Sequence, residues 1–132
     1  MNMNKSTNIS AIIIEDEPLA ASLLARYIQQ YSGLNCEKIA YNAIEASNFL
    51  ERNKVDLIFL DIHLPKIKGF DFLDLLKQEY AVILTTAYAQ YALDAYEKGI
   101  IDYLLKPIEY PRFEKAVERA IEQIELKRNA ST

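Results

Sequence analysis

Apolar residues along the chain fall into five short runs, and the segments between them repeat apolar positions at helical spacing. The runs occupy residues 9–14, 34–41, 55–60, 81–86 and 100–105. Short, nearly continuous apolar runs are typical of strands covered on both faces, whereas a strand with one wet face alternates. The run at 34–41 is more mixed than the others, which favours a place at or near an edge of the sheet.

Each run is followed by a stretch with the period of an amphipathic helix. The first stretch starts after Pro18, a residue favoured in the first turn of a helix, and stops at Ser32-Gly33. The fourth stops at Gly99, and the last runs to about residue 128. The apolar positions that mark these five expected helices are Leu19, Leu23, Leu24, Tyr27, Ile28 and Tyr31; Ala43, Ala46 and Leu50; Phe72, Leu75 and Leu76; Tyr91, Ala92, Ala95 and Tyr96; and Phe113, Val117, Ala120, Ile121 and Ile124.

Strands that alternate with single helices predict an α/β fold. Each helix must cross over between strands that run in the same direction, so the sheet is parallel and helices cover both faces. We therefore expect one doubly wound domain with five strands and five helices over residues 9–128. Residues 1–8 are expected to form a flexible N-terminal tail. Residues 129–132 are expected to be a short C-terminal end, with no output domain in this chain.

Composition narrows the classes of function. The 132 residues are 51% hydrophobic and 26% charged, which fits a globular domain with a sizeable core. The net charge of -4 gives no basic footprint, so we expect no direct binding of nucleic acid by this chain. The single cysteine, Cys36, cannot form an internal disulfide, and no apolar run is long enough to cross a membrane. We expect a cytoplasmic protein with no membrane contact.

Polar residues whose side chains could bind a ligand or take part in a reaction stand at the ends of four runs. Asp16 follows the first run, Asp61 ends the third, Thr86 ends the fourth and Lys106 follows the fifth. In doubly wound sheets the carboxyl ends of the strands meet at one edge, and ligands bind there. Residues spread over 90 positions of sequence are therefore expected to form one site.

Several acids at one edge repel one another unless a cation compensates them. Glu15 adds a third carboxylate to Asp16 and Asp61. Mg²⁺ suits such a group, because it takes one or two carboxylates, keeps waters and bridges to phosphoryl oxygens. Beside a lysine and a hydroxyl, a carboxylate of this kind can attack phosphorus and carry an acyl phosphate.

Four segments in order, "IIIEDEP", "LDIHLPKIKG", "TTA" and "DYLLKP", resemble the receiver domain of two-component response regulators. The resemblance covers the chain from Ile12 to the last helix. It implies a flavodoxin-like fold with strand order 2-1-3-4-5 and phosphorylation by a sensor histidine kinase with Mg²⁺, followed by self-catalysed dephosphorylation. The roles it implies are phosphoacceptor for Asp61, direct metal ligand for Asp16, metal ligand through water for Glu15, metal ligand through its backbone carbonyl for His63, phosphoryl contacts for Thr86 and Lys106, and switch aromatic for Tyr103.

The segment from Thr85 to Phe113 looks closest to receivers of the LytTR class. Full-length members of that class carry a C-terminal DNA-binding domain, through which we expect control of transcription. The resemblance also suggests a cis bond between Lys106 and Pro107, since X-Pro bonds adopt cis at modest cost.

An output surface is expected on the face formed by the fourth helix, the fifth strand and the fifth helix. An inward movement of Thr86 would leave a space that Tyr103 can fill, which couples the site to this face. Its mixture of aromatic and oppositely charged side chains favours a two-fold homodimer stabilised by phosphorylation. The side chains are Tyr91, Asp94, Tyr96, Lys98, Arg112, Lys115, Glu118 and Arg119.

Three other functions use similar sequence features. A metal-dependent phosphatase of the haloacid dehalogenase type would carry an aspartate two residues after its nucleophile, and that position here is His63. A mononucleotide binder would carry a small-residue phosphate loop after the first strand, where "EDEPLA" is acidic. A degenerate receiver that serves only as a protein adaptor would lack some of the chemical groups that are present here.

Overall fold

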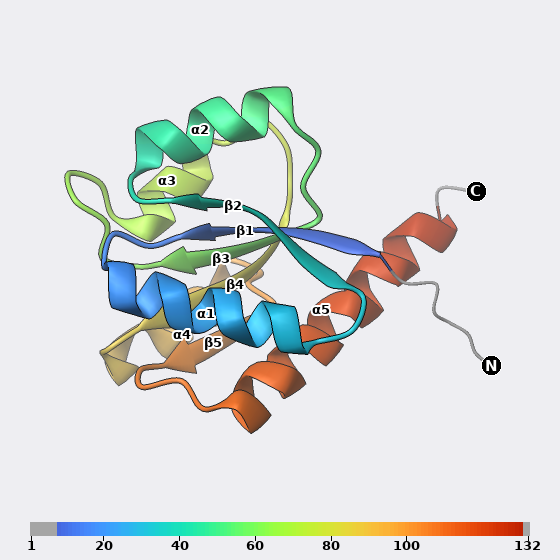
Figure 1. The fold of residues 1–132 in the computed structure, drawn as a ribbon. Coiled ribbons are helices and arrows are strands. Elements are labelled where there is room, and N and C mark those ends of the chain that lie inside the picture. Colours follow the sequence, from blue (N-terminus) through green and yellow to red (C-terminus); the bar gives the residue numbers. More distant parts are fainter. Residues whose placement is uncertain (1–7, 131–132) are drawn as a thin grey trace.

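The computed structural model describes residues 8–130, which form a five-stranded sheet and its helices (Figure 1). The elements in chain order are β1 (Ile9–Ile14), α1 (Pro18–Gln30), β2 (Leu34–Ala40), α2 (Ala43–Arg52), β3 (Leu57–Asp61), α3 (Gly69–Leu75), β4 (Ala81–Thr86), the 3₁₀ turn η2 (Ala89–Tyr91), α4 (Ala92–Glu97), β5 (Asp102–Leu105) and α5 (Tyr110–Ala130). The expected tail falls outside the described residues except for Asn8, as do residues 131–132 of the expected C-terminal end.

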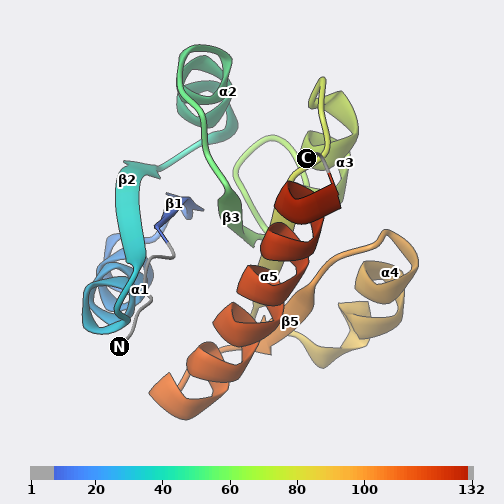
Figure 2. The same cartoon turned by 90° about the vertical axis from the view of Figure 1, so that its right-hand side faces the viewer.

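All neighbouring strands pair in parallel, in the order β2-β1-β3-β4-β5. This confirms the doubly wound α/β prediction and places the mixed strand β2 at an edge. Figure 2 shows α1 and α5 on one side of the sheet, with α2, α3 and α4 on the other. The chain reverses its winding between β1 and β3, so the carboxyl ends of these two strands flank the point where ligands bind in such sheets.

Alternate residues of each strand pack into two apolar cores. Ile13, Phe59 and Ile83 face α1 and α5, where they meet side chains such as Leu24 and Phe113. The residues that follow each of them in sequence, Ile14, Leu60 and Leu84, face α2, α3 and α4. Because this alternation continues to the strand ends, it decides which side of the sheet each polar residue of the site faces.

Several element boundaries differ from the expected ones. β3 starts at Leu57 instead of residue 55, and just before it the carboxylate of Asp56 accepts hydrogen bonds from the backbone N–H and hydroxyl of Ser10 at 2.9 and 3.1 Å. β5 starts at Asp102 instead of residue 100. The fourth helix is only Ala92–Glu97, since the turn before it is 3₁₀.

The bond between Lys106 and Pro107 is cis, as the sequence resemblance suggested.

Within residues 8–130, no helix is both long and apolar enough to cross a membrane.

Candidate functional site

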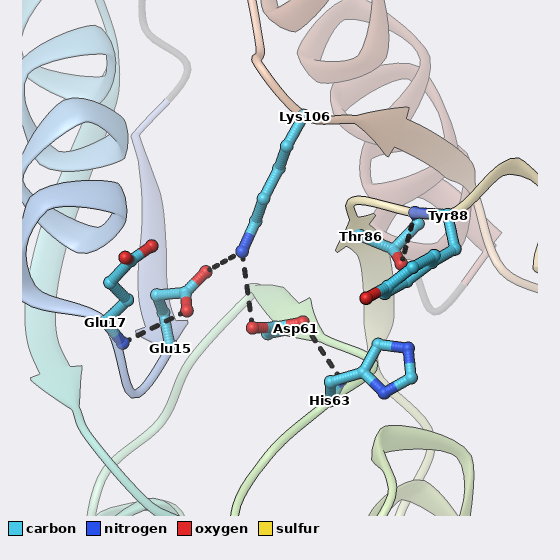
Figure 3. A network of polar contacts seen from close by, with 7 residues as sticks. All are labelled: Glu15, Glu17, Asp61, His63, Thr86, Tyr88 and Lys106. Atoms are coloured by element: carbon cyan, nitrogen blue, oxygen red, sulfur yellow. Dashed lines mark hydrogen bonds and ion pairs between the residues drawn. The ribbon is translucent and has the colours of Figure 1, made fainter.

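Asp61 is the last residue of β3 and lies at the carboxyl edge of the sheet. Only 5% of its surface is exposed. One carboxylate oxygen, Oδ1, accepts a hydrogen bond from the backbone N–H of His63 at 2.9 Å. The other, Oδ2, lies 3.3 Å from the ammonium nitrogen of Lys106. Strand, turn and lysine together hold the carboxylate in one orientation (Figure 3).

Lys106 bridges Asp61 to a second buried acid, Glu15. The lysine follows β5 and its ammonium nitrogen lies 2.7 Å from Oε1 of Glu15, which follows β1. Glu15 is 1% exposed, and its Oε2 accepts the backbone N–H of Glu17 at 3.2 Å. Figure 3 shows the lysine reaching between the two carboxylates. The phosphoryl contact that the sequence resemblance implies for Lys106 stays a prediction, whereas its pairing with Glu15 is a finding of the structure.

The charges of this site do not balance. Burial raises the pKa of Glu15 to about 7, with the Asp61 carboxylate adding to the rise and Lys106 opposing it. Burial alone would lower the pKa of Lys106, but the carboxylates of Glu15 and Asp61 outweigh it and raise that pKa above its ordinary value. Two buried carboxylates share one ammonium group, so the site carries a surplus of negative charge whenever both carboxylates are ionised.

Asp16 adds a third carboxylate, exposed at the edge of the site. Single oxygen atoms of Glu15, Asp16 and Asp61 lie within 4.8 Å of one another, close enough to ligate one ion. An all-oxygen set with surplus negative charge fits a hard divalent cation such as Mg²⁺ and suits softer metals poorly. The three acids that the sequence indicated are therefore brought together. Ligation by the backbone carbonyl of His63 stays a prediction.

Thr86 ends β4 and lies across Asp61 from Glu15 (Figure 3). It is fully buried, and its hydroxyl oxygen accepts the backbone N–H of Tyr88 at 3.1 Å. The backbone carbonyl of Tyr88 in turn accepts a hydrogen bond from the hydroxyl of Tyr103. Thr86 and Tyr103, both expected as switch residues, are thus joined through one residue of the β4–α4 loop. Tyr88 was missed by the sequence analysis, although it stands only two positions after Thr86.

The loop after Asp61 folds back beneath the site. The N–H of Gly69 donates to the carbonyl of Ile62 at 2.7 Å, and His63 pairs with Lys68 across the loop. A Cβ atom at Gly69 would lie 2.9 Å from the carbonyl oxygen of Asp61 and 3.0 Å from the Cα of Ile62. The absence of a side chain at Gly69 therefore lets α3 approach the backbone of Asp61, a role that the sequence analysis did not recognise.

The ring of His63 packs outside the site against two tyrosines. Its centroid lies 5.1 Å from that of Tyr88 and 5.3 Å from that of Tyr91, both edge to face. The side chain is exposed and directed away from Lys106 in Figure 3. The imidazole of His63 is therefore an exposed ring beside the site.

A parallel sheet with this strand order, two buried acids and a bridging lysine at its carboxyl edge defines a regulatory phosphoacceptor domain. A family model described as "Response regulator receiver domain" matches residues 11–118. The chain belongs to this family and is a phosphorylation-dependent signalling receiver.

Curated relatives support the same family. The chain is 39% identical over 117 residues to an "Uncharacterized response regulatory protein" of Vibrio cholerae, which covers 87% of this chain and 49% of the relative. It is 35% identical over 113 residues to the "Transcriptional regulatory protein BtsR" of Escherichia coli, covering 84% and 47%. The chain thus spans about half the length of the curated relatives it matches.

Solved structures agree in fold. The response regulatory domain of mrkE from Klebsiella pneumoniae superposes with a TM-score of 0.80 at 29% identity, covering 89% of this chain and 99% of that one. The response regulator TrrA from Thermotoga maritima, solved in complex with Mg²⁺ and BeF, gives 0.73 at 26% identity, covering 85% and 98%.

Proposed function

We propose that Asp61 accepts the phosphoryl group, and that the donor is a phosphohistidine of a sensor histidine kinase. The observation that carries this proposal is the arrangement around Asp61. Its carboxylate is buried and held at both oxygens, and an ammonium group lies 3.3 Å away. Glu15 is also buried and held at both oxygens, but Asp61 lies on the side of the site that faces Thr86, the expected second phosphoryl contact (Figure 3).

The transfer needs little from the protein beyond position and charge. A carboxylate oxygen of Asp61 forms a bond to phosphorus as the phosphorus–nitrogen bond of the donor breaks, and the imidazole leaves with the electron pair of that bond. Lys106 balances the charge on the phosphoryl oxygens, and the hydroxyl of Thr86 donates to one of them. Hydrolysis reverses the modification when water attacks phosphorus, which restores the Asp61 carboxylate and releases inorganic phosphate.

We propose that Mg²⁺ is held directly by Asp16 and Asp61, by the backbone carbonyl of His63, and by Glu15 through water. The support is the group of three carboxylates within 4.8 Å. When bound, the ion neutralises part of the negative charge that collects on the phosphoryl oxygens. The similar receiver TrrA was solved with Mg²⁺ and BeF, a phosphoryl mimic, bound together.

The test is intact-mass spectrometry after incubation with acetyl phosphate and Mg²⁺. The protein is expected to gain one phosphoryl group, and Asp61→Asn is expected to gain none. Ser10→Ala is a matched control, because Ser10 lies at the opposite end of β1. Equal uptake by wild type and Asp61→Asn would contradict the assignment of the phosphoacceptor.

Phosphorylation is proposed to act through the hydrogen-bonded path from Thr86 to Tyr103. If Thr86 turns its hydroxyl toward the new phosphoryl group, it gives up the N–H of Tyr88. The Tyr88 carbonyl then moves relative to the hydroxyl of Tyr103, on strand β5. A change at the carboxyl edge of the sheet is thereby carried to the face formed by α4, β5 and α5.

We propose that this face associates with a second copy of the chain when Asp61 is phosphorylated. A groove of about 550 Å³ runs between α4 and α5, and Tyr96 beside it is 83% exposed. Leu93, on the same helix, is 67% exposed. The exposed charges around them include both signs, Asp94 and Glu118 against Lys98 and Lys115, as a self-complementary surface requires.

Two arginines of this face are already occupied within the chain. Arg112 forms a two-pronged pair with Asp102 at 2.7 and 2.9 Å, and Arg119 joins it at 3.1 Å. Their reversal would therefore disturb β5 as well as the surface. Tyr96→Ser is the cleaner test. In sedimentation velocity with beryllofluoride, wild type is expected to dimerise at micromolar concentration and Tyr96→Ser to remain monomeric. A wild type that stays monomeric would contradict this proposal.

The output is proposed to be transcription, carried by a domain outside the residues that the structure describes. The support is that one relative of about twice this length is named a transcriptional regulatory protein.

We propose that the protein acts in the cytoplasm. The support is that Cys36 is a free cysteine, which fits a reducing compartment.

A further inference from the structure

Thr85 carries a buried hydroxyl with no partner. The residue is 1% exposed and lies one position before Thr86 on β4. Among the side chains that the structure describes, its Oγ1 is the buried polar atom that makes no hydrogen bond. Buried hydroxyls are nearly always satisfied, because leaving one unpaired destabilises the fold. A valine would fill the same space without that cost.

The register of the sheet places Thr85 beside Asp61. Thr85 is the partner of Asp61 across β3 and β4, so their side chains lie beside each other on the α1 and α5 face. Its partner on β5 is Leu104, two residues before Lys106. Since β4 lies between β3 and β5, the lysine side chain crosses β4 to reach Asp61.

In the resting site Thr85 makes no side-chain hydrogen bond, and each carboxylate oxygen of Asp61 already has another partner. Oδ1 of Asp61 accepts the N–H of His63, and Oδ2 faces the ammonium of Lys106. After phosphoryl transfer the lysine faces a more strongly charged group, and its hold on the carboxyl oxygen of Asp61 weakens. The hydroxyl of Thr85, the strand partner of Asp61, is then a donor without a partner on that face of the sheet.

We propose that Thr85 is a positioning residue for phosphorylation: its hydroxyl donates to the carboxyl group of Asp61 once Lys106 turns to the phosphoryl group. The hydroxyl is thus unpaired in the resting protein and paired in the modified one. This inference rests on the proposed function, in which Asp61 is the phosphoacceptor. It assigns a role to the first threonine of the "TTA" segment that is distinct from that of Thr86.

Two substitutions separate this role from a structural one. Thr85→Val removes the hydroxyl and keeps the shape, whereas Thr85→Ser keeps the hydroxyl and removes a methyl group. Urea unfolding without phosphodonor is expected to rank Thr85→Val at or above wild type and Thr85→Ser below it. Phosphoryl uptake from acetyl phosphate is expected to rank them the other way, with a loss of about tenfold in rate for Thr85→Val and a rate near wild type for Thr85→Ser.

Opposite orders in the two measurements support the proposal, because a packing role would move stability and uptake together. Wild-type uptake by Thr85→Val overturns it, and so does an equal loss of uptake in Thr85→Val and Thr85→Ser. The Asp61→Asn variant is measured alongside. If Asp61→Asn takes up phosphoryl groups as wild type does, the assignment of Asp61 as phosphoacceptor is refuted. This outcome differs from every result of the comparison between the two Thr85 variants, so the two failures can be told apart.

Discussion

Replacing Gly69 by alanine sets two physical effects of opposite sign against each other. Gly69 is the first residue of α3. Alanine there is expected to stabilise the helix, by at most about 1 kcal/mol relative to glycine. The added Cβ, however, would lie 2.9 Å from the carbonyl oxygen of Asp61 and 3.0 Å from the Cα of Ile62. Both are backbone atoms, which cannot rotate away as a flexible side chain can.

The steric clash of the added Cβ atom is expected to outweigh the gain in helix stability. Overpacking in a dense region costs roughly 1–3 kcal/mol, so a net loss of about 1–2 kcal/mol in the free energy of unfolding remains after the helical gain. The backbone must also move where it carries Asp61, the proposed phosphoacceptor. A displacement of a fraction of an ångström at Asp61 is expected to slow phosphoryl uptake by about tenfold or more.

Gly99→Ala provides the matched control. Gly99 has φ +76, and a Cβ atom added there would meet no atom within 4 Å. Alanine at this position is therefore expected to destabilise the fold only through its left-handed backbone, by about 1–2 kcal/mol. Urea unfolding and the initial rate of uptake from acetyl phosphate are measured for both variants. Similar losses of stability are expected, with slowed uptake in Gly69→Ala alone. A Gly69→Ala protein as stable and as reactive as wild type would refute the steric argument.

Three further substitutions test separate parts of the molecule. Asp16→Ala is expected to abolish Mg²⁺ binding and phosphoryl uptake while stabilising the metal-free protein by a few tenths of a kcal/mol; calorimetric titration with Mg²⁺ at the wild-type level would count against the assigned ligands. Thr86→Ala is expected to take up phosphoryl but to lose most of the beryllofluoride-induced association seen by sedimentation; undiminished association would separate Thr86 from the switch. Asp102→Asn is expected to cost about 1–3 kcal/mol at pH 7. Burial would raise the pKa of Asp102, but Arg112, the N–H of Tyr103 and Arg119 outweigh it and lower that pKa. The stabilisation is therefore present above the unfolded pKa of about 4 and lost as pH falls through the folded pKa, so the gap between wild type and Asp102→Asn in urea unfolding should close in acid; a constant gap would contradict this.

The positions of the strands could be predicted because burial on both faces leaves a strong signal. The runs at 9–14 and 81–86 are the strands that form. The amino ends of β3 and β5 could not be placed as well. Asp56, just before β3, is hydrogen-bonded to Ser10, and such partners from distant segments of the chain leave no local sequence signal.

For the site, the sequence was informative about which residues meet and silent about how they pair. Strand ends place Glu15, Asp16, Asp61 and Lys106 at one edge by topology alone. Whether Lys106 pairs with one acid or two depends on side-chain reach across β4, which no local pattern encodes. The link from Tyr103 to Tyr88 depends in the same way on the path of a loop.

The bridge from Lys106 to Glu15 joins residues 91 positions apart. A chain that is still being synthesised has Glu15, Asp16 and Asp61 well before its last strand can dock, yet it lacks the lysine that pairs with Asp61. Reactivity is therefore expected to appear only when β5 is in place. The same dependence holds in the finished protein: a local opening that releases β5 and α5 would silence the site while β1, β2 and β3 remain folded. Because Lys106 follows the last strand, the site is expected to be reactive only in a completely folded domain.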